Sequence, residues 1–434
     1  MKKIIKTPVH SEQHADSYYA ATANWHTSYP KLEERFTVDV CVIGGGFSGV
    51  STALELSERG YKVALLEARK IGWGASGRNG GQLIRGIGEE PEQFRQQIGE
   101  QGVAAIHQMG FDAVELVRQR IKKYDIQCDL KMGYMDVAIK PKHLTSIRSE
   151  YDLLKKYHYP HELTWVEQSD MQAFVGSQRY IGGLVDKGSG HLHPLNLCLA
   201  EARIAEQLGT RIFEYSPVVK INKGNKPEVI TEHGAVHADF LVLAGNAYMG
   251  GLVPEIGGKV LPAGSYILGT EPLPEPLWQS LIPKDMAICD ASVTLDYFRL
   301  SADKRLLFGG MCNYSGRDPK SITAALRPKM LRVFPQLKNT SIEFEWGGMI
   351  GIGANRMPQV GRITPNIYYA QAYSGHGVNA THMAGRVLAD AITGQSERFD
   401  VFNGIKHITF PGGQYFRSPL LALGMLWYRM KEAV

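Results

Sequence analysis

The hydrophobic pattern over residues 36–68 predicts a strand, a helix and a second strand in close succession. The first strand is expected in VDVCVIG, which is apolar, rich in β-branched residues and interrupted at Gly44. A helix is expected in FSGVSTALELSERG, where apolar side chains recur near helical spacing and Gly60 is a typical end signal. The second strand is expected in KVALLEA and reaches Glu67. A strand–turn–helix–strand unit of about thirty residues is the context that a dinucleotide-binding fingerprint requires.

Three glycines at the first turn have separate roles in that fingerprint. Gly44 permits the tight turn, Gly46 lets the backbone approach a pyrophosphate, and Gly49 lets the helix pack closely on the strand. Phe47 and Ser48 begin the helix, whose N-terminal N–H groups point toward the phosphates. We therefore expect a dinucleotide at this turn.

The acidic residue at the end of the second strand narrows the choice of dinucleotide. Glu67, with Ala68 beside it, is placed to accept hydrogen bonds from ribose hydroxyls. A carboxylate at this position disfavours a 2′-phosphate, which argues against NADP. NAD and FAD both stay open at this point.

A second glycine-rich stretch, IGWGASGRNGGQL at residues 71–83, favours FAD. FAD extends well past the first pyrophosphate turn, and a loop stripped of side chains can lie along its pyrophosphate and ring. A flexible lid or linker is the alternative, disfavoured because Arg, Asn and Gln stand among the small residues. The residues of this loop expected to contact FAD are Ala75, Ser76, Asn79, Gly80 and Gln82.

Two later segments support the choice of FAD. Residues 236–250 are expected to form an apolar strand and a turn that return the chain toward the nucleotide. Residues 366–392 predict a strand, then Gly375, His376 and Gly377, then a helix rich in small residues. The N–H groups at that helix start are placed to stabilise negative charge on a reduced flavin.

With these motifs in order, the sequence resembles the FAD-dependent amine oxidases of the D-amino-acid oxidase, sarcosine oxidase and glycine oxidase group. The resemblance runs over nearly the whole chain and is strongest to the bacterial members that oxidise gamma-glutamylputrescine. The segments that carry it are SYYAATAN, IGWGASGRNGGQL, GHLHPLNL, AGNAYMG, LDYFRLSADKRLLFGG, NRMPQVGR, YSGHGV and FPGG.

The resemblance and the pattern together imply an α/β fold with two interleaved domains. A discontinuous Rossmann-like FAD-binding domain is expected from 30–90, 160–260 and 340–400. An α+β substrate-binding domain built on an antiparallel sheet is expected from 91–159 and 261–339, with a long helix over 92–123 and strand-like residues over 130–142. The tail, 401–434, has an apolar patch too short to span a bilayer; it is expected to dock on the protein or a subunit partner, with weak membrane association as the alternative.

The family resemblance also implies the chemistry. A hydride passes from the carbon beside the amine nitrogen to flavin N5, the imine hydrolyses to an aldehyde, and oxygen reoxidises the flavin to give hydrogen peroxide. FAD is expected to be non-covalent, because WGGMIGIGANR has no cysteine where sarcosine oxidases carry their linkage. The substrate favoured is gamma-glutamylputrescine. Oxidation of L-pipecolate, sarcosine or another secondary amine, an amine dehydrogenase that reduces a quinone, and a redox-inactive FAD-binding module stay open.

His376, between two glycines at a helix start, is the strongest candidate for a residue at the flavin ring or the oxygen site. Tyr297 and Arg299 fall on one face of a predicted strand, where an arginine is suited to hold the carboxylate end of the substrate. An ordinary salt bridge is the alternative for Arg299.

Further candidates are less specific. Arg356 stands where family members bring a loop across the flavin, and Val219 joins the expected cofactor contacts. His193, with His191, either lines the active site or forms a structural pair; nearby partners for zinc are lacking. Lys304 is a loose candidate for an oxygen-activating lysine.

Composition excludes other classes of function. The formal net charge is +5 without a long basic run, so nucleic acid is not expected as a partner. The five cysteines are scattered, so we expect buried free thiols and no metal site. Without a signal-peptide pattern or about 20 consecutive apolar residues, the protein is expected in the cytoplasm. The expected partners are a small-molecule amine and oxygen, and the oligomeric state stays open.

Overall fold

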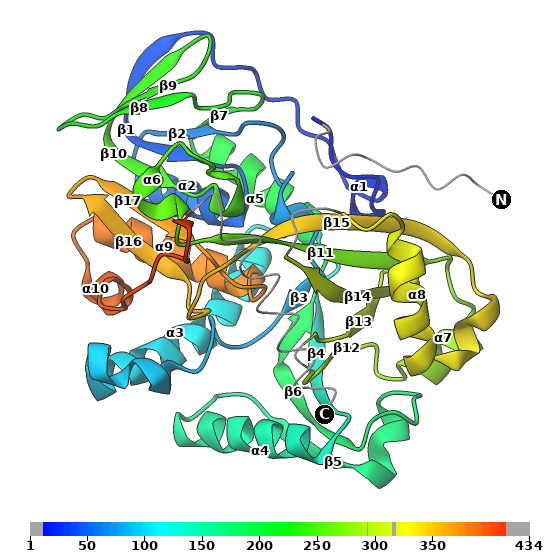
Figure 1. The fold of residues 1–434 in the computed structure, drawn as a ribbon. Coiled ribbons are helices and arrows are strands. Elements are labelled where there is room, and N and C mark those ends of the chain that lie inside the picture. The colour runs from blue at the N-terminus through cyan, green and yellow to red at the C-terminus, as the bar shows by residue number, and fades with distance from the viewer. Residues whose placement is uncertain (1–11, 293, 315–317, 414–434) are drawn as a thin grey trace.

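The computed structural model describes residues 12–292, 294–314 and 318–413, and its strands form two sheets (Figure 1). The strands of the first sheet are β1 (Arg35–Ile43), β2 (Val63–Leu66), β7 (Arg211–Phe213), β8 (Lys220–Asn222), β9 (Glu228–Ile230), β10 (Ala235–Leu243), β16 (Gln359–Thr364) and β17 (Ile367–Gln371). Their order is β16-β17-β10-β1-β2-β7, with β9 beside β10 and β8 beside β9. From β17 to β7 the neighbouring strands run parallel, whereas β16 and β9 are antiparallel to their neighbours.

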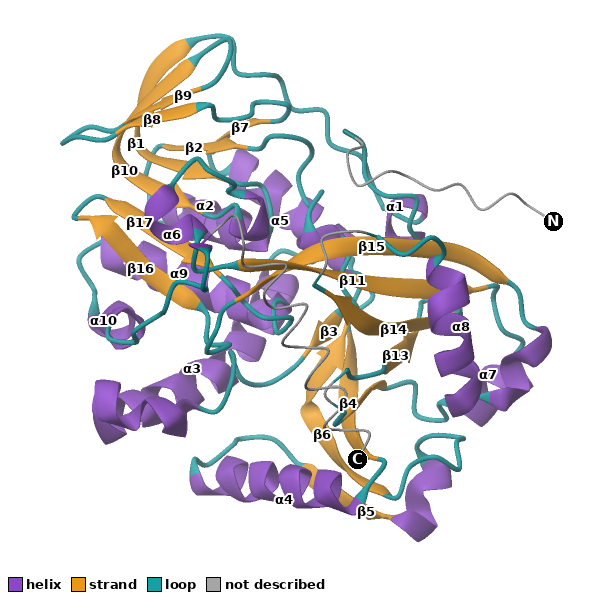
Figure 2. Ribbon diagram, viewed as in Figure 1, coloured by secondary structure: helices purple, strands orange, loops and turns teal. Residues whose placement is uncertain are grey.

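Helices cover the sheets, as Figure 2 shows in purple. They are α1 (Tyr18–Ala21), α2 (Phe47–Glu58), α3 (Arg95–Lys123), α4 (Pro141–Lys156), α5 (Pro194–Gln207), α6 (Pro254–Gly257), α7 (Glu275–Leu281), α8 (Ile322–Val333), α9 (Val378–Ile392) and α10 (Glu397–Asn403). Short 3₁₀ turns are η1 (Ala75–Gly77), η2 (Pro91–Phe94), η3 (Gln168–Ala173), η4 (Asn246–Tyr248) and η5 (Pro335–Asn339). The helices α2 and α9 pack on each other and on the first sheet, with α5 against α2 and α3 against α9.

The core of the first sheet follows the alternation of side chains along β1. Val40 and Val42 join the hydrophobic cluster that includes α2, α5 and α9, whereas Cys41 and Ile43 join a second cluster with β10 and α6. Both clusters are buried, so the central strand is apolar on both faces, as parallel strands usually are. The predicted strand, helix and strand over 36–68 are confirmed as β1, α2 and β2.

The second sheet is almost entirely antiparallel. Its strands are β3 (Gln82–Leu83), β4 (Lys131–Ala138), β5 (Leu163–Glu167), β6 (Gly182–His191), β11 (Leu261–Thr270), β12 (Ala287–Asp290), β13 (Tyr297–Leu300), β14 (Leu306–Asn313) and β15 (Ile342–Ile352). The order is β15-β11-β14-β13-β12-β4-β6-β3, with β5 beside β6, and β12 and β4 are its parallel pair. Figure 1 shows β11 and β15 running across the direction of β4 and β6, so the sheet curls along its width.

The predicted fold class is confirmed: a largely parallel sheet with helices is interleaved along the chain with a mainly antiparallel sheet. The strands do not all follow the predicted segment bounds. β5, β6 and β15 pair in the second sheet, although 160–260 and 340–400 are expected in the FAD-binding domain. Strand pairing alone draws no domain boundary, so the division into domains stays a prediction.

Two local expectations need correction. The helix predicted over 92–123 begins as η2, and α3 contains a break at Gly99, whose φ of 70° and ψ of 175° are not helical. The strand-like stretch predicted over 130–142 ends at Ala138, because Pro141 starts α4 at a position that proline favours. The apolar part of the tail, 414–434, lies outside the described residues.

Candidate active site

A cavity of about 1050 Å³ extends from the first sheet to α4 and is lined by both sheets. Three groups of residues make up much of its wall. The first surrounds the turn after β1, the second combines the 71–83 loop with the start of α9 and with β13, and the third lies where β4 meets α4. Among the predicted cofactor contacts, the lining residues are Gly44, Gly46, Phe47, Ser48, Glu67, Ala68, Ala75, Ser76, Asn79, Gly80, Gln82, Gly375, His376 and Gly377.

The glycines after β1 occupy positions where a side chain would collide. Gly44 has φ +111°, and a Cβ there would lie 2.8 Å from the carbonyl oxygen of Ala244. A Cβ on Gly49 would lie 1.9 Å from the carbonyl oxygen of Gly44, which places α2 in direct contact with the strand end. Gly49 therefore does not line the cavity, and its packing role agrees with the fingerprint.

Ser76 and Glu67 shape the wall around the start of α2. Ser76 Oγ accepts a hydrogen bond from the N–H of Phe47 at 2.8 Å, and a Cβ on Gly46 would lie 2.8 Å from the same oxygen. The carboxylate of Glu67 accepts from the N–H groups of Gly45 at 2.6 Å and Arg69 at 2.8 Å. Burial raises the pKa of Glu67, and these two donors oppose that effect.

The 71–83 loop holds itself in shape with its own polar groups. Asn79 Nδ2 donates to the carbonyls of Ala75 and Ser76, and its Oδ1 accepts from the N–H of Gly81 at 2.7 Å. Gly80 lies under the ring of Tyr297, where a Cβ would approach Cε2 to 2.6 Å. The loop is rich in glycine because it lies between the cavity and β13, where larger side chains would collide with Tyr297.

The start of α9 forms the facing part of the wall. Ser374 and Gly375 have φ of +56° and +93°, and Gly377 caps the helix. His376 Nε2 lies 3.0 Å from the carbonyl of Gly86 and 3.3 Å from that of Ile84. Because both partners are acceptors, Nε2 carries the hydrogen. Burial lowers the pKa of His376, so its ring is neutral near pH 7.

On β13 the structure separates the two predicted substrate contacts. Tyr297 lines the cavity, and burial raises the pKa of its hydroxyl. Arg299 does not line this cavity: its guanidinium donates to the carbonyls of Gly80 at 2.7 Å and Leu192 at 2.8 Å, and to Tyr19 Oη at 3.1 Å. Because its donors are bound within the protein, the geometry does not favour a grip of Arg299 on a substrate carboxylate, and that role stays a prediction.

The two histidines near residue 190 are also structural. His193 caps α5, since its Nδ1 accepts from the N–H of Asn196 at 3.1 Å, and its Nε2 lies 3.1 Å from Thr22 Oγ1. His191 Nε2 lies 2.9 Å from the carbonyl of Asp285. Burial, assisted by the charge of Arg299, lowers the pKa of both rings to about 3. His193 lies outside the wall of the large cavity, so its role in the active site stays a prediction that this geometry does not favour.

Of the three remaining predicted residues, one lines the cavity and two do not. Arg356, with φ +53°, lines the cavity and is exposed. Val219 does not: its side chain is 60% exposed, and the lining residue is Val218, because neighbouring side chains of an extended chain point in opposite directions. Lys304 pairs with Asp285 at 2.5 Å and lies over the Trp278 ring, away from the cavity.

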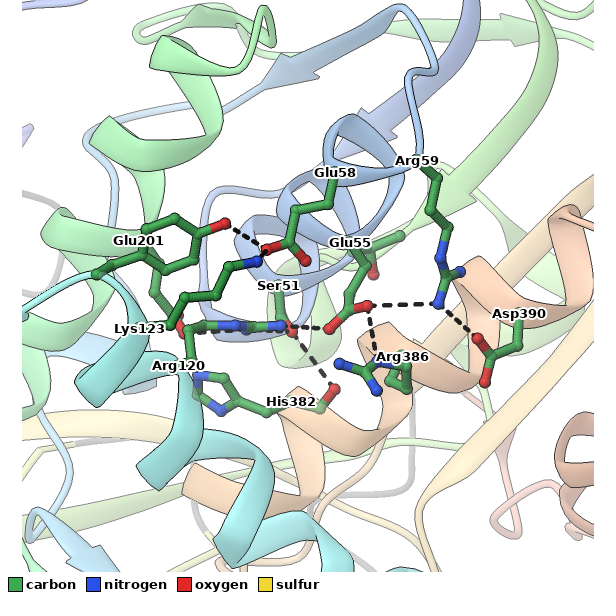
Figure 3. Close-up of polar contacts among 12 residues, drawn as sticks. Ser51, Glu55, Glu58, Arg59, Arg120, Lys123, Glu201, His382, Arg386 and Asp390 are labelled. Atoms are coloured by element: carbon green, nitrogen blue, oxygen red, sulfur yellow. Dashed lines mark hydrogen bonds and ion pairs between the residues drawn. The ribbon is translucent and has the colours of Figure 1, made fainter.

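The sequence reasoning missed two charged clusters. The cavity cluster, Arg85 with Asp136, Glu150 and Asp186, lies in the third group of the wall. The helix cluster lies behind α2 and is drawn in Figure 3; it consists of Arg59, Arg120, Arg386, Glu55, Glu201, Asp390 and His382.

The helix cluster connects α2 with α9, the two helices whose starts line the cavity, and also reaches α3 and α5. Arg120 donates to Glu201 and Ser51 at 3.0 Å and to Glu55 at 2.5 Å, so α3 is tied to α5 and α2. In α9, His382 Nε2 lies 2.9 Å from Glu201 Oε2, and its Nδ1 contacts the carbonyl of Val378. Both ring nitrogens of His382 therefore lie beside oxygen atoms, and the ring joins α9 to α5.

The wall fits FAD. The close approach at Gly46 leaves backbone where a pyrophosphate would lie, Glu67 stands at the end of β2, and the start of α9 presents its positive end to the ring region. Among the residues with assigned positions, no group of three or more His, Cys, Asp and Glu is arranged to hold a metal ion, and no helix could cross a membrane. All five cysteines are free, and Cys41, Cys128 and Cys198 are buried.

Known proteins agree with this assignment. Residues 39–391 match the family described as FAD dependent oxidoreductase. The chain is 42% identical over 421 residues to gamma-glutamylputrescine oxidoreductase of Escherichia coli, covering 97% of this chain and 99% of that protein. It is 41% identical over 427 residues to a probable oxidoreductase of Haemophilus influenzae, covering 97% and 98%.

The fold also occurs in solved structures. Glycine oxidase from Geobacillus kaustophilus superposes with a TM-score of 0.72 and 20% identity, covering 86% of this chain and 99% of that chain. The match over residues 39–391 and the full-length relatives agree with the glycine turns after β1 and before α9. This chain therefore belongs to the FAD-dependent oxidoreductases of the D-amino-acid oxidase family, and FAD is its cofactor.

Proposed function

We propose that this enzyme oxidises the primary amine of gamma-glutamylputrescine to an aldehyde. The amine carbon loses two electrons and a proton as hydride, the resulting imine takes up water and releases ammonia, and oxygen receives the electrons and becomes hydrogen peroxide. The observation that carries the proposal is the 42% identity, over 97% of the chain, to a protein named gamma-glutamylputrescine oxidoreductase.

Bound FAD supplies the acceptor for the hydride, at N5 of its ring. The protein's own groups hold the reacting partners and set the local charge. The N-terminus of α9 directs its dipole at the ring region and stabilises negative charge there. His376 is fixed by two carbonyls and stays neutral, so it adds no positive charge beside the substrate amine. Tyr297 closes the wall over Gly80 with its ring.

We also propose that FAD is held without a covalent bond. Among the cavity-lining residues the cysteines are Cys289 and Cys312, which lie in β12 and β14 of the second sheet rather than in β15. Denaturing the protein with acid is expected to release all of the flavin into the supernatant. Flavin that stays with the precipitate would contradict this part of the proposal.

The test of the substrate uses the visible spectrum of the purified holoenzyme under anaerobic conditions. Gamma-glutamylputrescine, putrescine, L-pipecolate and sarcosine are added in separate cuvettes. We expect gamma-glutamylputrescine to bleach the flavin bands at the lowest concentration, and air to restore them with release of hydrogen peroxide. If another amine is preferred, the substrate assignment fails. If air restores the bands slowly but a quinone restores them fast, the acceptor assignment fails.

A further inference from the structure

The cavity cluster holds one guanidinium between three carboxylates from different elements. Arg85 Nη1 donates to Asp186 Oδ2 at 3.1 Å, and Nη2 donates to Asp136 Oδ2 at 2.8 Å and to Glu150 Oε1 at 2.7 Å. Asp136 belongs to β4, Asp186 to β6 and Glu150 to α4, which lies beside β4 and β6 in Figure 1. One positive charge therefore faces three negative charges, which leaves the cavity cluster with two negative charges in excess.

Only part of this excess is covered by the protein. Asp186 is fully buried and also accepts from Tyr159, the N–H of Gly188 and Ser189. Asp136 and Glu150 line the cavity, with 19% and 46% of their side chains exposed. Asp136 accepts one more hydrogen bond, from Tyr134 at 2.8 Å.

A second observation shows that the cavity cluster is incomplete. Arg85 is 4% exposed and lines the cavity, and its Nε, a buried donor, has no hydrogen-bond partner among the described residues. Buried donors in proteins nearly always have a partner, and the partner of this donor must be an acceptor, such as a carboxylate or carbonyl oxygen of a ligand that also carries the cationic group.

The excess charge has a measurable effect on Asp136. Burial and repulsion from Glu150 raise the pKa of Asp136 to about 6, although Arg85 lowers it. Excess charge of one sign is costly when it is partly removed from water. A positive group of a ligand would offset that cost.

The surroundings of the cavity cluster suit a chain of methylene groups. The same part of the wall contains the apolar side chains Ile106, Phe111, Ile147, Leu153 and Leu154. Gly86, the residue after Arg85, is hydrogen-bonded to the start of α9. Its carbonyl accepts from His376 Nε2 at 3.0 Å and from Asn379 Nδ2 at 2.5 Å. A ligand can therefore extend from the α9 start to the cavity cluster within one cavity.

We propose that Asp136 and Glu150, held in place by Arg85, form an anionic subsite that binds a second cationic group of the substrate, apart from the amine that is oxidised. The inference rests on the proposed function and narrows the substrate class to amines that carry a second ammonium group. In gamma-glutamylputrescine this group is the α-ammonium of the glutamyl end. Two carboxylates and a methylene-lined approach are the chemistry that recognises it.

The experiment compares gamma-glutamylputrescine with glutarylputrescine, which lacks only the α-ammonium. Both are titrated calorimetrically into holoenzyme whose flavin has been reduced with dithionite, so that binding is measured without turnover. We expect wild type to bind gamma-glutamylputrescine about 10- to 100-fold more tightly, as a charged hydrogen bond in a partly buried site implies. Glu150→Gln and Asp136→Asn are expected to bring this ratio close to one, with flavin content confirming that both variants fold.

The matched control is Asp152→Asn, which removes one negative charge from an exposed position of α4 outside the cavity wall and should keep the wild-type ratio. A wild-type ratio near one, or a ratio unchanged in both subsite variants, overturns the proposal. The oxidised holoenzyme is then mixed with each amine. Flavin bleaching by both amines with equal affinities keeps the proposed function and rejects the subsite. The full affinity ratio without any bleaching keeps the subsite and rejects the proposed function.

Discussion

Two buried arginines are each surrounded by carboxylates, and they differ in how completely their surroundings balance the charge. In the helix cluster (Figure 3), three guanidinium groups face three carboxylates, so the charges of these six groups balance. In the cavity cluster, Arg85 alone faces three carboxylates. Arg120 and Arg85 both have partners on both terminal nitrogens, and Arg85 in addition keeps a buried Nε that has no partner among the described residues.

The difference separates a structural ion network from a ligand-binding one. An ion network whose charges balance within the chain is not stabilised further by a charged ligand. Removing one of its members therefore lowers the free energy of unfolding. A network that carries excess charge at a cavity wall is stabilised when a ligand of opposite charge arrives, and its loss is felt mainly in binding. Three substitutions and one change of pH test this contrast, beginning with the substitution expected to cost the most stability.

Arg120→Met should lower the free energy of unfolding by about 3–5 kcal/mol, because it leaves Glu55 and Glu201 buried without one of their cations. Urea unfolding of the holoenzyme measures the change. Arg118→Met is the control, since Arg118 pairs with Glu115 at the exposed side of the same helix and should cost at most about 0.5 kcal/mol. Equal losses in both variants would contradict a structural role for the helix cluster.

Arg85→Met should lower the free energy of unfolding by about 1–3 kcal/mol at pH 8, and by less at pH 5. Without the guanidinium, which lowers the pKa of Asp136, this already raised pKa rises further above its unfolded value. A carboxyl group whose pKa is higher in the folded state than in the unfolded state destabilises the folded state at pH values above the folded pKa. This destabilisation disappears as the pH falls and the carboxyl group binds a proton in both states. Urea unfolding at both pH values measures this, and a larger loss at pH 5 would be the wrong sign.

The affinity for gamma-glutamylputrescine should fall about tenfold between pH 7.5 and pH 5, because Asp136, with a pKa of about 6, loses its charge over this interval. KM over this range measures the effect, and the slope should be absent in Asp136→Asn. Glutarylputrescine should show no such slope through this residue. Arg85 and the hydrogen bond from Tyr134 lower the pKa of Asp136, and repulsion from Glu150 raises it. The charge of Asp136 in turn raises the pKa of Cys289.

Glu150→Gln should lower the free energy of unfolding by at most about 0.5 kcal/mol, and a small increase is equally consistent. The reason is that the substitution removes part of an uncompensated negative charge. The same substitution at Glu201 should lower it by about 3 kcal/mol, since Glu201 is fully buried between Arg120 and His382. Thermal unfolding of the two variants side by side gives the comparison. A loss at Glu150 as large as that at Glu201 would remove the distinction between the clusters.

The sequence predicts the cofactor side of this protein well because the signals there are local. Gly44, Gly46 and Gly49 lie within a few residues of one another, and their spacing alone reports the turn, the backbone approach and the helix contact. The strand before His376 and the helix after it follow the same kind of short-range pattern. One register error arose even here, at Val219, since the neighbouring Val218 is the residue that lines the cavity.

The clusters could not be derived in the same way, because their members are brought together by the fold. Glu55 and Glu201 are far apart in the chain, and only the packing of α2 on α5 makes them neighbours of one guanidinium. One signal was readable: Arg120 stands three residues after Val117 and seven after Ala113, on the apolar stripe of its helix. A charge on such a stripe predicts a buried partner, without saying which one. Arg299 shows the same limit, because the spacing of Tyr297 and Arg299 could not reveal that the guanidinium donates to backbone carbonyls and to Tyr19.

The pairing of β1 with β10 has a consequence for how the protein is made. Ile43 pairs with Leu243, so β1 leaves the ribosome about 200 residues before its central partner does. The glycine turn after β1 faces its final surroundings only after β10, β17 and the start of α9 have been synthesised. Loading of FAD is therefore expected late in biosynthesis, and the early apolar strand lacks its central partner until then. A shortage of FAD would reduce the yield of folded enzyme as well as its activity, because a ligand that binds only the folded state draws the chain toward it.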